Sequence, residues 1–256
     1  MMLKHLDLFS GVGGFALAAR WCNGIETTQF VELDENCHGP IQRHWPGIPI
    51  HRDIRSFTAK PDTWNLLTAG FPCQDISKAN PKGQGLKGEM SRLWFEVLRI
   101  IREARPTYIV LENAPSTIGR NWLRTILEGL NACGYDAQWS IVSVRSLGGR
   151  HLRNRHFVLA YPSSLRLNEN AYAAQVASQD LSAIASRRWQ KNIKSAIPIR
   201  GRATDIPVPR ALRGSNGLPT RMDKNRIKML GNAVSPQVAM IPLLKVLQME
   251  RSRERD

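Results

Sequence analysis

Cysteine is scarce in this sequence, and long apolar runs are missing. The four cysteines are scattered and form no C-x-x-C pair, at Cys22, Cys37, Cys73 and Cys133. This spacing predicts neither a zinc site nor a disulfide framework, and it fits a reducing compartment. No stretch reaches the roughly 18 apolar residues that a membrane-spanning helix needs, and Asp7 interrupts the N-terminal apolar run that a secretion signal would require. We therefore expect a cytoplasmic protein without a membrane segment or a bound metal.

Acidic residues are scarce in the second half of the chain. Residues 1–140 carry 15 Lys and Arg against 14 Asp and Glu, which gives a net charge of +1. Residues 141–256 carry 21 against 7, which gives +14. Such a concentration of charge is either a solubilising basic surface or a binding footprint for a polyanion, most plausibly nucleic acid.

Short apolar runs alternate with helical patterns over the first 160 residues. The strand candidates span 5–9, 29–33, 66–69, 107–112, 139–144 and 156–160, and helical patterns cover 16–21, 91–104 and 123–130. This alternation predicts an α/β fold, with a mostly parallel sheet and helices on both faces.

The alternation fades after the last strand candidate. Residues 162–205 are polar, basic and without clear periodicity, and a helical signal returns from about 226. The 256 residues suffice for one large domain, with or without a small appendage. We expect a main domain over 1–161, a small basic region over 162–205, a returning segment over 206–250 and a frayed tail over 251–256.

Cys73 lies in a short, stiff segment, and an acidic residue follows 39 positions later at the end of an apolar run. Pro72 has a fixed φ and no amide hydrogen, and it pushes Phe71 toward an extended conformation. Cys73 and Glu112 therefore form a candidate pair of nucleophile and proton donor. Taken alone, a lone cysteine is more often a small core residue.

A glycine-rich turn follows the first strand candidate, within residues 7–15. The G-x-G-x-x-A pattern that starts at Gly11 matches a dinucleotide fingerprint, and Glu32 follows at a strand end about 20 residues later. A carboxylate there suits the ribose hydroxyls of either NAD or S-adenosylmethionine. A purely structural turn explains the glycines equally well, and Asp53 is placed either to contact an adenine or to cap a turn.

Seven segments together resemble the motifs of the DNA (cytosine-5)-methyltransferase family, especially its short bacterial and phage-type members. In the order of the family, they are 7–15, 31–34, 53–54, 70–77, 111–113, 153–155 and 230–234. The resemblance implies a Rossmann-like S-adenosylmethionine-dependent methyltransferase fold with a small basic target-recognition region. It also implies methyl transfer to C5 of a cytosine that is flipped out of duplex DNA.

The same resemblance assigns roles to individual residues. Cys73 would add to C6 of cytosine, and Glu112 would hydrogen-bond N3 and supply a proton to it, a role that favours a buried carboxyl with a raised pKa. Arg155 would contact O2, with Arg153 in support, although both could equally be a solvated basic strand end. The implied cofactor pocket comprises Phe9, Gly11, Gly13, Gly14, Glu32, Asp53, Ile54, Pro72 and Asn232. The implied DNA-side residues are Gln74, Asn113, His151, Arg187, Arg188 and Lys191.

The chain departs from the family pattern at two places. Arg150 and His151 stand where many members have Pro-Gln, which affects the expected shape of that loop. Only about 75 residues separate Arg155 from Gly231, and they must contain the target-recognition element, which we place at 162–205.

Other functions explain less of the sequence. A nicotinamide dehydrogenase accounts for the glycine turn but not for Cys73, and a cysteine hydrolase would need His151 or His156 as a base without a supporting signature. A tRNA cytosine-5 methyltransferase of the same family and a non-catalytic DNA-binding relative remain alternatives. The implied partner is double-stranded DNA, bound by a monomer, and a cognate restriction endonuclease is a candidate functional partner.

Overall fold

The central strands are apolar on both faces because helices cover both sides of the sheet. The computed structural model describes residues 2–70, 89–113, 120–147, 153–165, 181–196, 229 and 232–254. The strands are β1 (Leu3–Leu8), β2 (Ile25–Val31), β3 (Ile50–His51), β4 (Leu66–Ala69), β5 (Tyr108–Asn113), β6 (Tyr135–Ser143) and β7 (Asn154–Pro162). All positions of β4 and β5 are buried, as is typical of parallel strands between two helical layers.

The sheet has the order β3-β2-β1-β4-β5-β7-β6. Strands β3, β2, β1, β4 and β5 are parallel, whereas β7 runs antiparallel to both β5 and β6. The expected mostly parallel α/β sheet is therefore confirmed. The strand order reverses between β1 and β4, and the carboxyl ends of the strands at such a point form the usual ligand-binding crevice of this architecture.

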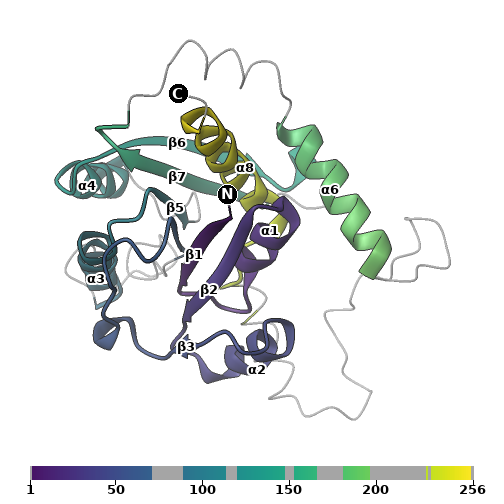
Figure 1. Cartoon of the computed structure of the whole chain (residues 1–256), viewed down its shortest axis with the longest axis horizontal. Helices are drawn as coiled ribbons and strands as arrows, with labels where there is room; N and C mark the ends of the chain where they lie inside the picture. The colour runs from purple at the N-terminus through teal and green to yellow at the C-terminus, as the bar shows by residue number, and fades with distance from the viewer. Residues whose placement is uncertain are drawn as a thin grey trace.

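Two separate apolar clusters hold the helices on the two faces (Figure 1). One face carries α1 (Gly14–Cys22), α6 (Leu181–Ala196) and α8 (Pro236–Arg253), and the other carries α3 (Glu89–Ala104) and α4 (Arg120–Asn131). The short α2 (Glu35–His44) packs near β2, where Ile41 and Trp45 contact Phe30. No helix in the described ranges is long and apolar enough to cross a membrane.

The structure differs from the sequence-based expectation at several elements. Helix α3 begins at Glu89 rather than at Ser91, and β6 begins at Tyr135, four residues before the expected strand. Helix α6 lies within 162–205, where no regular element was predicted. Helix α8 continues to Arg253, so part of the tail expected to fray is helical, because Arg253 pairs with Glu250 one turn earlier. The expected boundaries of the four regions stay predictions.

Candidate functional site

The glycine turn connects β1 to α1 at the carboxyl edge of the sheet. Phe9, Gly11 and Gly13 all have positive φ, at 53°, 54° and 85°, and Gly13 is the N-terminal cap of α1. Gly14 is the first residue of that helix. The turn therefore places a helix N-terminus at the edge where the sequence predicted a cofactor.

Glu32, which directly follows β2, fixes this turn through hydrogen bonds to its carboxylate. Its carboxylate accepts a hydrogen bond of 2.7 Å from the N–H of Gly11 and another of 2.8 Å from the N–H of Asp34. Leu33, the next residue, is 64% exposed, which is unusual for a large apolar side chain beside a polar turn. Sequence reasoning missed Leu33, and its signal was an apolar residue directly after the strand-end carboxylate.

Asp53 follows β3 and caps the short 3-10 helix η1 (Ile54–Ser56). Its carboxylate accepts from the backbone N–H of Arg55 at 3.0 Å and pairs with the Arg55 guanidinium at 2.9 Å. Hydrogen bonds from Arg55 hold the pKa of Asp53 below its usual value. The capping interpretation of Asp53 is thus correct, and it leaves the carboxylate fixed at the sheet edge.

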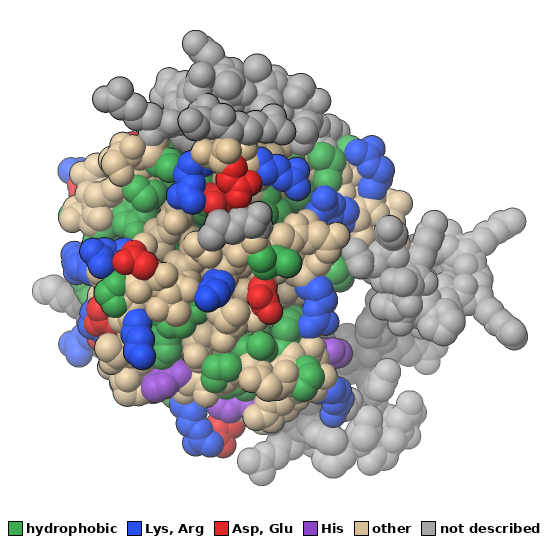
Figure 2. All heavy atoms as spheres, viewed as in Figure 1, with side chains coloured by type: hydrophobic (Ala, Val, Ile, Leu, Met, Phe, Trp, Pro, Cys, Tyr) green, Lys and Arg blue, Asp and Glu red, His purple; other side chains and the backbone are tan. Residues whose placement is uncertain are grey.

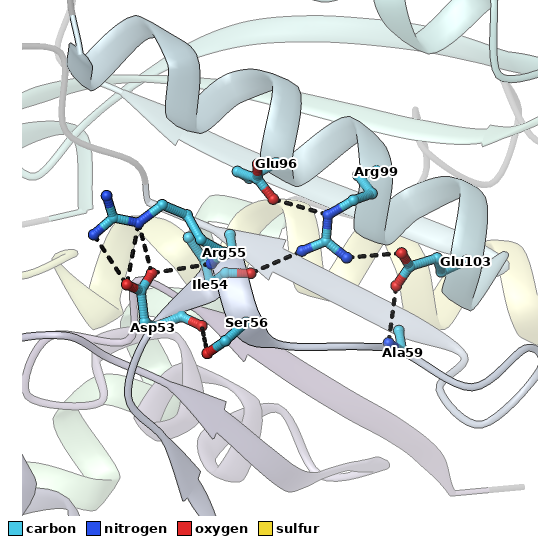
Figure 3. A network of polar contacts seen from close by, with 8 residues as sticks. All are labelled: Asp53, Ile54, Arg55, Ser56, Ala59, Glu96, Arg99 and Glu103. Atoms are coloured by element: carbon cyan, nitrogen blue, oxygen red, sulfur yellow. Dashed lines mark hydrogen bonds and ion pairs between the residues drawn. The ribbon is translucent and has the colours of Figure 1, made fainter.

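An arginine from α3 donates a hydrogen bond to the same turn (Figure 3). Arg99 donates to the carbonyl oxygen of Ile54 at 2.8 Å, and its guanidinium is itself paired with Glu96 at 2.8 Å and Glu103 at 2.7 Å. Glu103 in turn accepts from the N–H of Ala59 at 3.0 Å. Sequence reasoning missed this network. The spacing of Glu96, Arg99 and Glu103 along one helix was an available signal, whereas the contacts with Ile54 and Ala59 span 45 and 44 residues.

These turns lie at one edge because their strands are parallel and in register. Leu8 pairs with Val31, and Val31 pairs with His51, so the residues that follow all three strands are neighbours. The edge combines apolar side chains with fixed carboxylates, namely those of Phe9, Leu33, Ile54, Glu32 and Asp53. Apolar groups suit a purine face and carboxylates suit hydroxyl and amine donors, so the donor set fits the adenosine part of S-adenosylmethionine.

Glu112 is a nearly buried carboxyl at the end of β5, and two arginines from β7 flank it. Oε1 of Glu112 lies 2.7 Å from Nε of Arg155, and the Glu112 side chain is only 9% exposed. Burial raises the pKa of Glu112 to about 7, and this effect outweighs the opposing charges of Arg155 and Arg153. A carboxyl with such a pKa can hold a proton and give it up near neutral pH.

Arg153 connects this acid to the C-terminal segment. Its Nη2 donates to the carbonyl oxygen of Ala233 at 2.5 Å, across 80 residues of sequence. Burial lowers the pKa of the half-buried Arg153 guanidinium, and the charge of Arg155 lowers it further. Asn232, the predicted lid of the cofactor pocket, is exposed beside Ala233. The Arg-x-Arg pair thus contacts both the acid and the segment before α8.

A buried polar chain runs beneath the glycine turn. Nδ1 of His5 lies 2.8 Å from Oγ1 of Thr27, and Nε2 of His5 lies 2.7 Å from Oγ1 of Thr68. The Thr68 hydroxyl donates to Oδ1 of Asp7 at 2.8 Å. Since that hydroxyl has one proton to give, Nε2 of His5 must donate to Thr68, which fixes the tautomer. Burial lowers the pKa of His5 to about 3 and raises that of Asp7 to about 7.

Several predicted site residues are not tested by these contacts. Pro72, Cys73, Gln74 and His151 lie outside the described residues. Gly70, the last described residue before them, ends the β4 segment, and a Cβ placed on it would lie 3.5 Å from Oε2 of Glu112. Asn113 is buried beside Glu112 at the end of β5.

The predicted DNA-contacting residues of the basic region lie on α6. Arg187 is exposed, and Lys191 lies on the same helix. The Arg188 guanidinium donates to the carbonyl oxygens of Cys22 and Trp21 at the end of α1. Arg188 therefore has a partner within the protein, and a DNA contact of Arg187 or Lys191 stays a prediction. Within the described part of the chain, no three His, Cys, Asp or Glu side chains gather as a metal site.

Comparisons with known proteins identify the family of this chain. Residues 3–206 match the family model of the C-5 cytosine-specific DNA methylases. Type II methyltransferase M.Sau3AI of Staphylococcus aureus is 27% identical over 188 residues, which cover 65% of this chain and 45% of that protein. M.DsaV of Dactylococcopsis salina is 32% identical over 163 residues, which cover 62% and 46%. The chain spans about half the length of the curated relatives that it matches.

Solved structures support the fold. A putative DNA modification methyltransferase encoded within an E. coli prophage superposes with a TM-score of 0.53 at 22% identity, over 66% of this chain and 50% of that one. The S. pombe Dnmt2 methyltransferase superposes with a TM-score of 0.52 at 22% identity, over 62% and 51%. At this identity the likeness establishes the fold alone.

Proposed function

Because the chain belongs to the C-5 cytosine-specific DNA methylase family, we propose that it methylates C5 of a cytosine in duplex DNA. The observation that carries this proposal is the buried Glu112, with its pKa near 7, paired to Arg155 and facing the end of β4 that leads to Cys73. Nucleophilic attack on a cytosine ring requires an acid of this kind. Strand β4, which leads to the proposed nucleophile Cys73, ends beside Glu112.

The residue types follow from the chemistry of cytosine. C5 is too weakly nucleophilic to take a methyl group directly, so the Cys73 thiolate first forms a bond to C6. Glu112 gives a proton to N3 as negative charge develops there, while Arg155 stabilises O2. C5 then gains enamine character and bonds the methyl carbon, whose bond to the sulfonium sulfur would break and leave S-adenosyl-L-homocysteine as the product. Loss of the C5 proton to a base re-forms the C5–C6 double bond and expels Cys73, while N3 returns its proton to Glu112.

The carboxyl edge of β1, β2 and β3 would hold the cofactor. S-adenosylmethionine, when bound, supplies a methyl group activated by its sulfonium sulfur. Glu32 has lone pairs free on its carboxylate for ribose hydroxyls, and its bonds to Gly11 and Asp34 fix its orientation. Leu33 and Phe9 offer apolar surface to the adenine, and Asp53 offers an acceptor to its amine.

The target cytosine would be flipped out of the duplex, because C5, C6 and N3 are inaccessible in a stacked base pair. The element that recognises the DNA sequence is proposed to lie within 162–205. The relatives M.Sau3AI and M.DsaV are named as Type II methyltransferases, and on this basis a cognate restriction endonuclease is a candidate functional partner.

Trapping of a covalent adduct tests the proposal. The protein is incubated with S-adenosylmethionine and a mixture of duplex DNAs that contain 5-fluorocytosine at many sequence contexts. Fluorine cannot leave as a proton does, so the enzyme stays bonded to C6 and migrates as a denaturation-resistant complex. We expect an adduct with duplex DNA, and a parallel arm with 5-fluorocytosine-containing tRNA transcripts separates the two substrate classes.

Two variants identify the residues responsible. Cys73→Ser should abolish the adduct. Glu112→Gln, which keeps the shape but cannot give a proton, should slow its formation by about 10²-fold or more. Folded wild-type protein that yields no adduct with any DNA or RNA would contradict the proposed function. An adduct with tRNA alone would assign the enzyme to RNA.

A further inference from the structure

Val234 lies between the backbones of two glycines from different parts of the site. A Cβ on Gly14, at the start of α1, would overlap the carbonyl oxygen of Val234. A Cβ on Gly70, at the end of β4, would lie 2.8 Å from Cγ2 of Val234, which is closer than real carbon atoms approach. Val234 is itself 7% exposed. Val234 thus fills the space that two absent side chains leave, with its backbone carbonyl at Gly14 and its side chain at Gly70.

Each of the two glycines adjoins one functional segment of the proposed enzyme, the cofactor turn or the segment that carries Cys73. Gly14 follows the cofactor turn directly, and Gly70 precedes the segment that carries Cys73. The same Gly70 position lies 3.5 Å from Oε2 of Glu112 and 3.9 Å from the ring of Phe15. Val234 is therefore in contact with the cofactor side and the nucleophile side of the site at once.

The segment around Val234 has contacts of its own on both sides of Val234 in the sequence. Arg153 donates to the carbonyl oxygen of Ala233 at 2.5 Å, which ties the segment to β7. Helix α8 begins two residues after Val234, at Pro236, and packs on α1 within the same apolar cluster. A residue that is held in this way can set the spacing of the two glycines that contact it.

We propose that Val234 is a positioning residue that sets the distance between the cofactor turn and Gly70, the residue after which the chain continues to Cys73. The inference rests on the proposed function, since the spacing matters because a methyl group must pass from cofactor to base. Methyl transfer is sensitive to about 1 Å of misplacement, which can cost as much as 10²-fold in rate. Binding of each ligand alone depends on one side of the site and tolerates the same shift.

A double-mutant cycle between Gly70 and Val234 tests the inference. In Gly70→Ala the new Cβ meets Cγ2 of Val234, and single-turnover methyl transfer should fall by about tenfold or more. Val234→Ala should lower the same rate, with the KM for S-adenosylmethionine changed less than about threefold, because it loosens spacing rather than binding. In Gly70→Ala/Val234→Ala the Cβ occupies the vacated space, and the rate should recover about tenfold relative to Gly70→Ala.

A glycine elsewhere in the core provides the matched control. A Cβ on Gly129 of α4 would lie 2.9 Å from Cδ1 of Leu98, a similar overlap on the opposite face of the sheet. Gly129→Ala should leave the rate per folded molecule unchanged, because the end of the Leu98 side chain can shift and this packing lies on the other face of the sheet. Adding Val234→Ala to it should lower the rate by the same factor as Val234→Ala alone.

The outcomes separate this inference from the proposed function. If the wild-type enzyme is active and the variants change only the melting temperature or only the KM, the proposed role of Val234 is wrong and the proposed function stands. The role of Val234 is also wrong if the wild-type enzyme is active and the double variant recovers no activity. Wild-type protein that forms no adduct with any nucleic acid would remove the proposed function and this role together.

Discussion

At the scale of single residues, His5 and Asp7 carry opposite pKa shifts within one hydrogen-bonded chain through Thr68. The pKa of His5 is lowered to about 3, so folding expels a proton that the unfolded chain binds below pH 6.5. The pKa of Asp7 is raised to about 7, so folding takes up a proton that the unfolded chain releases above about pH 4. Between about pH 4 and pH 6.5, the His5 effect makes the free energy of unfolding rise with pH and the Asp7 effect makes it fall, so the two contributions cancel.

Single substitutions should reveal how each group makes the free energy of unfolding depend on pH. In Asp7→Asn only the His5 effect remains, and the free energy of unfolding should fall as the pH drops from 6.5 to 4, by up to about 1.4 kcal/mol per unit. In His5→Gln only the Asp7 effect remains, and the free energy should fall as the pH rises from 4 to 7. Urea titrations at pH 4.5, 5.5 and 6.5 measure both. Variants that keep the pH dependence of the wild type would show that the two groups do not titrate as a pair.

Which residues the sequence could predict depends on how local their setting is. The burial of Glu112 followed from its place at the end of an apolar run, and the raised pKa follows from burial. The contact of Arg153 with Ala233 spans 80 residues, and nothing near either residue indicates it. The surroundings of Cys73 lie outside the described residues, so its role as the nucleophile stays a prediction.

At the scale of elements, α6 shows why a helix can lack a visible apolar stripe. Its buried side contains Leu181 and Ala185, with Ile184 partly buried, and the next position on that side is Arg188. The Arg188 guanidinium donates to carbonyl oxygens at the end of α1, where positive charge also complements the helix dipole. A charged residue in the buried stripe interrupts the periodicity, and this is why the sequence pattern does not predict a helix there.

Two neighbouring arginines on α6 should differ in their effect on stability. Arg188→Ala leaves carbonyl oxygens of α1 without their donor and should lower the free energy of unfolding by about 1–3 kcal/mol. Arg187→Ala removes an exposed side chain and should change it by less than about 0.5 kcal/mol. Urea unfolding of the two variants measures the difference. Equal decreases would mean that the contact between α6 and α1 contributes nothing to stability.

The missed α2 had a different cause. Gly39 and Pro40 lie within the helix, and both residues ordinarily argue against one. The signal that was available is its N-terminal cap, since the Asp34 side chain accepts from the N–H of Asn36 at 3.0 Å. Strands β4 and β5, by contrast, were predictable because each is a short apolar run that is buried at every position.

At the scale of the whole molecule, the basic charge of the second half is spread along the chain. On the face in Figure 2, the described Lys and Arg side chains lie singly or in small groups among acidic and apolar ones. Residues 141–161 contribute four of the +14 charges, residues 162–205 contribute four, and residues 206–256 contribute six. The proposed recognition element therefore carries less than a third of the excess charge.

Nucleic-acid binding should therefore weaken steeply with salt. Each neutralised phosphate contributes a slope of about −0.9 to the logarithm of affinity against the logarithm of salt concentration. Removing charge with Arg187→Gln and Lys191→Gln should reduce that slope by about one for each phosphate that the variant no longer neutralises. Lys4→Gln, at the opposite edge of the sheet from the site, should leave it unchanged. Fluorescence anisotropy with labelled duplex DNA measures the slopes, and binding that is insensitive to salt would contradict the footprint.

The packing of α8 on α1 also sets an order of events during synthesis. Cys22 contacts the carbonyl oxygen of Met240 across 218 residues, so the two sides of this contact leave the ribosome far apart in time. The glycine turn and the strand that carries Glu112 are made first, and Val234 follows Glu112 by 122 residues. At about 5–20 residues per second, these residues take roughly 6–24 s to synthesise. A chain cut short before Val234 has both halves of the proposed chemistry and lacks the residue that sets their spacing, so we expect incomplete copies to lack the proposed activity.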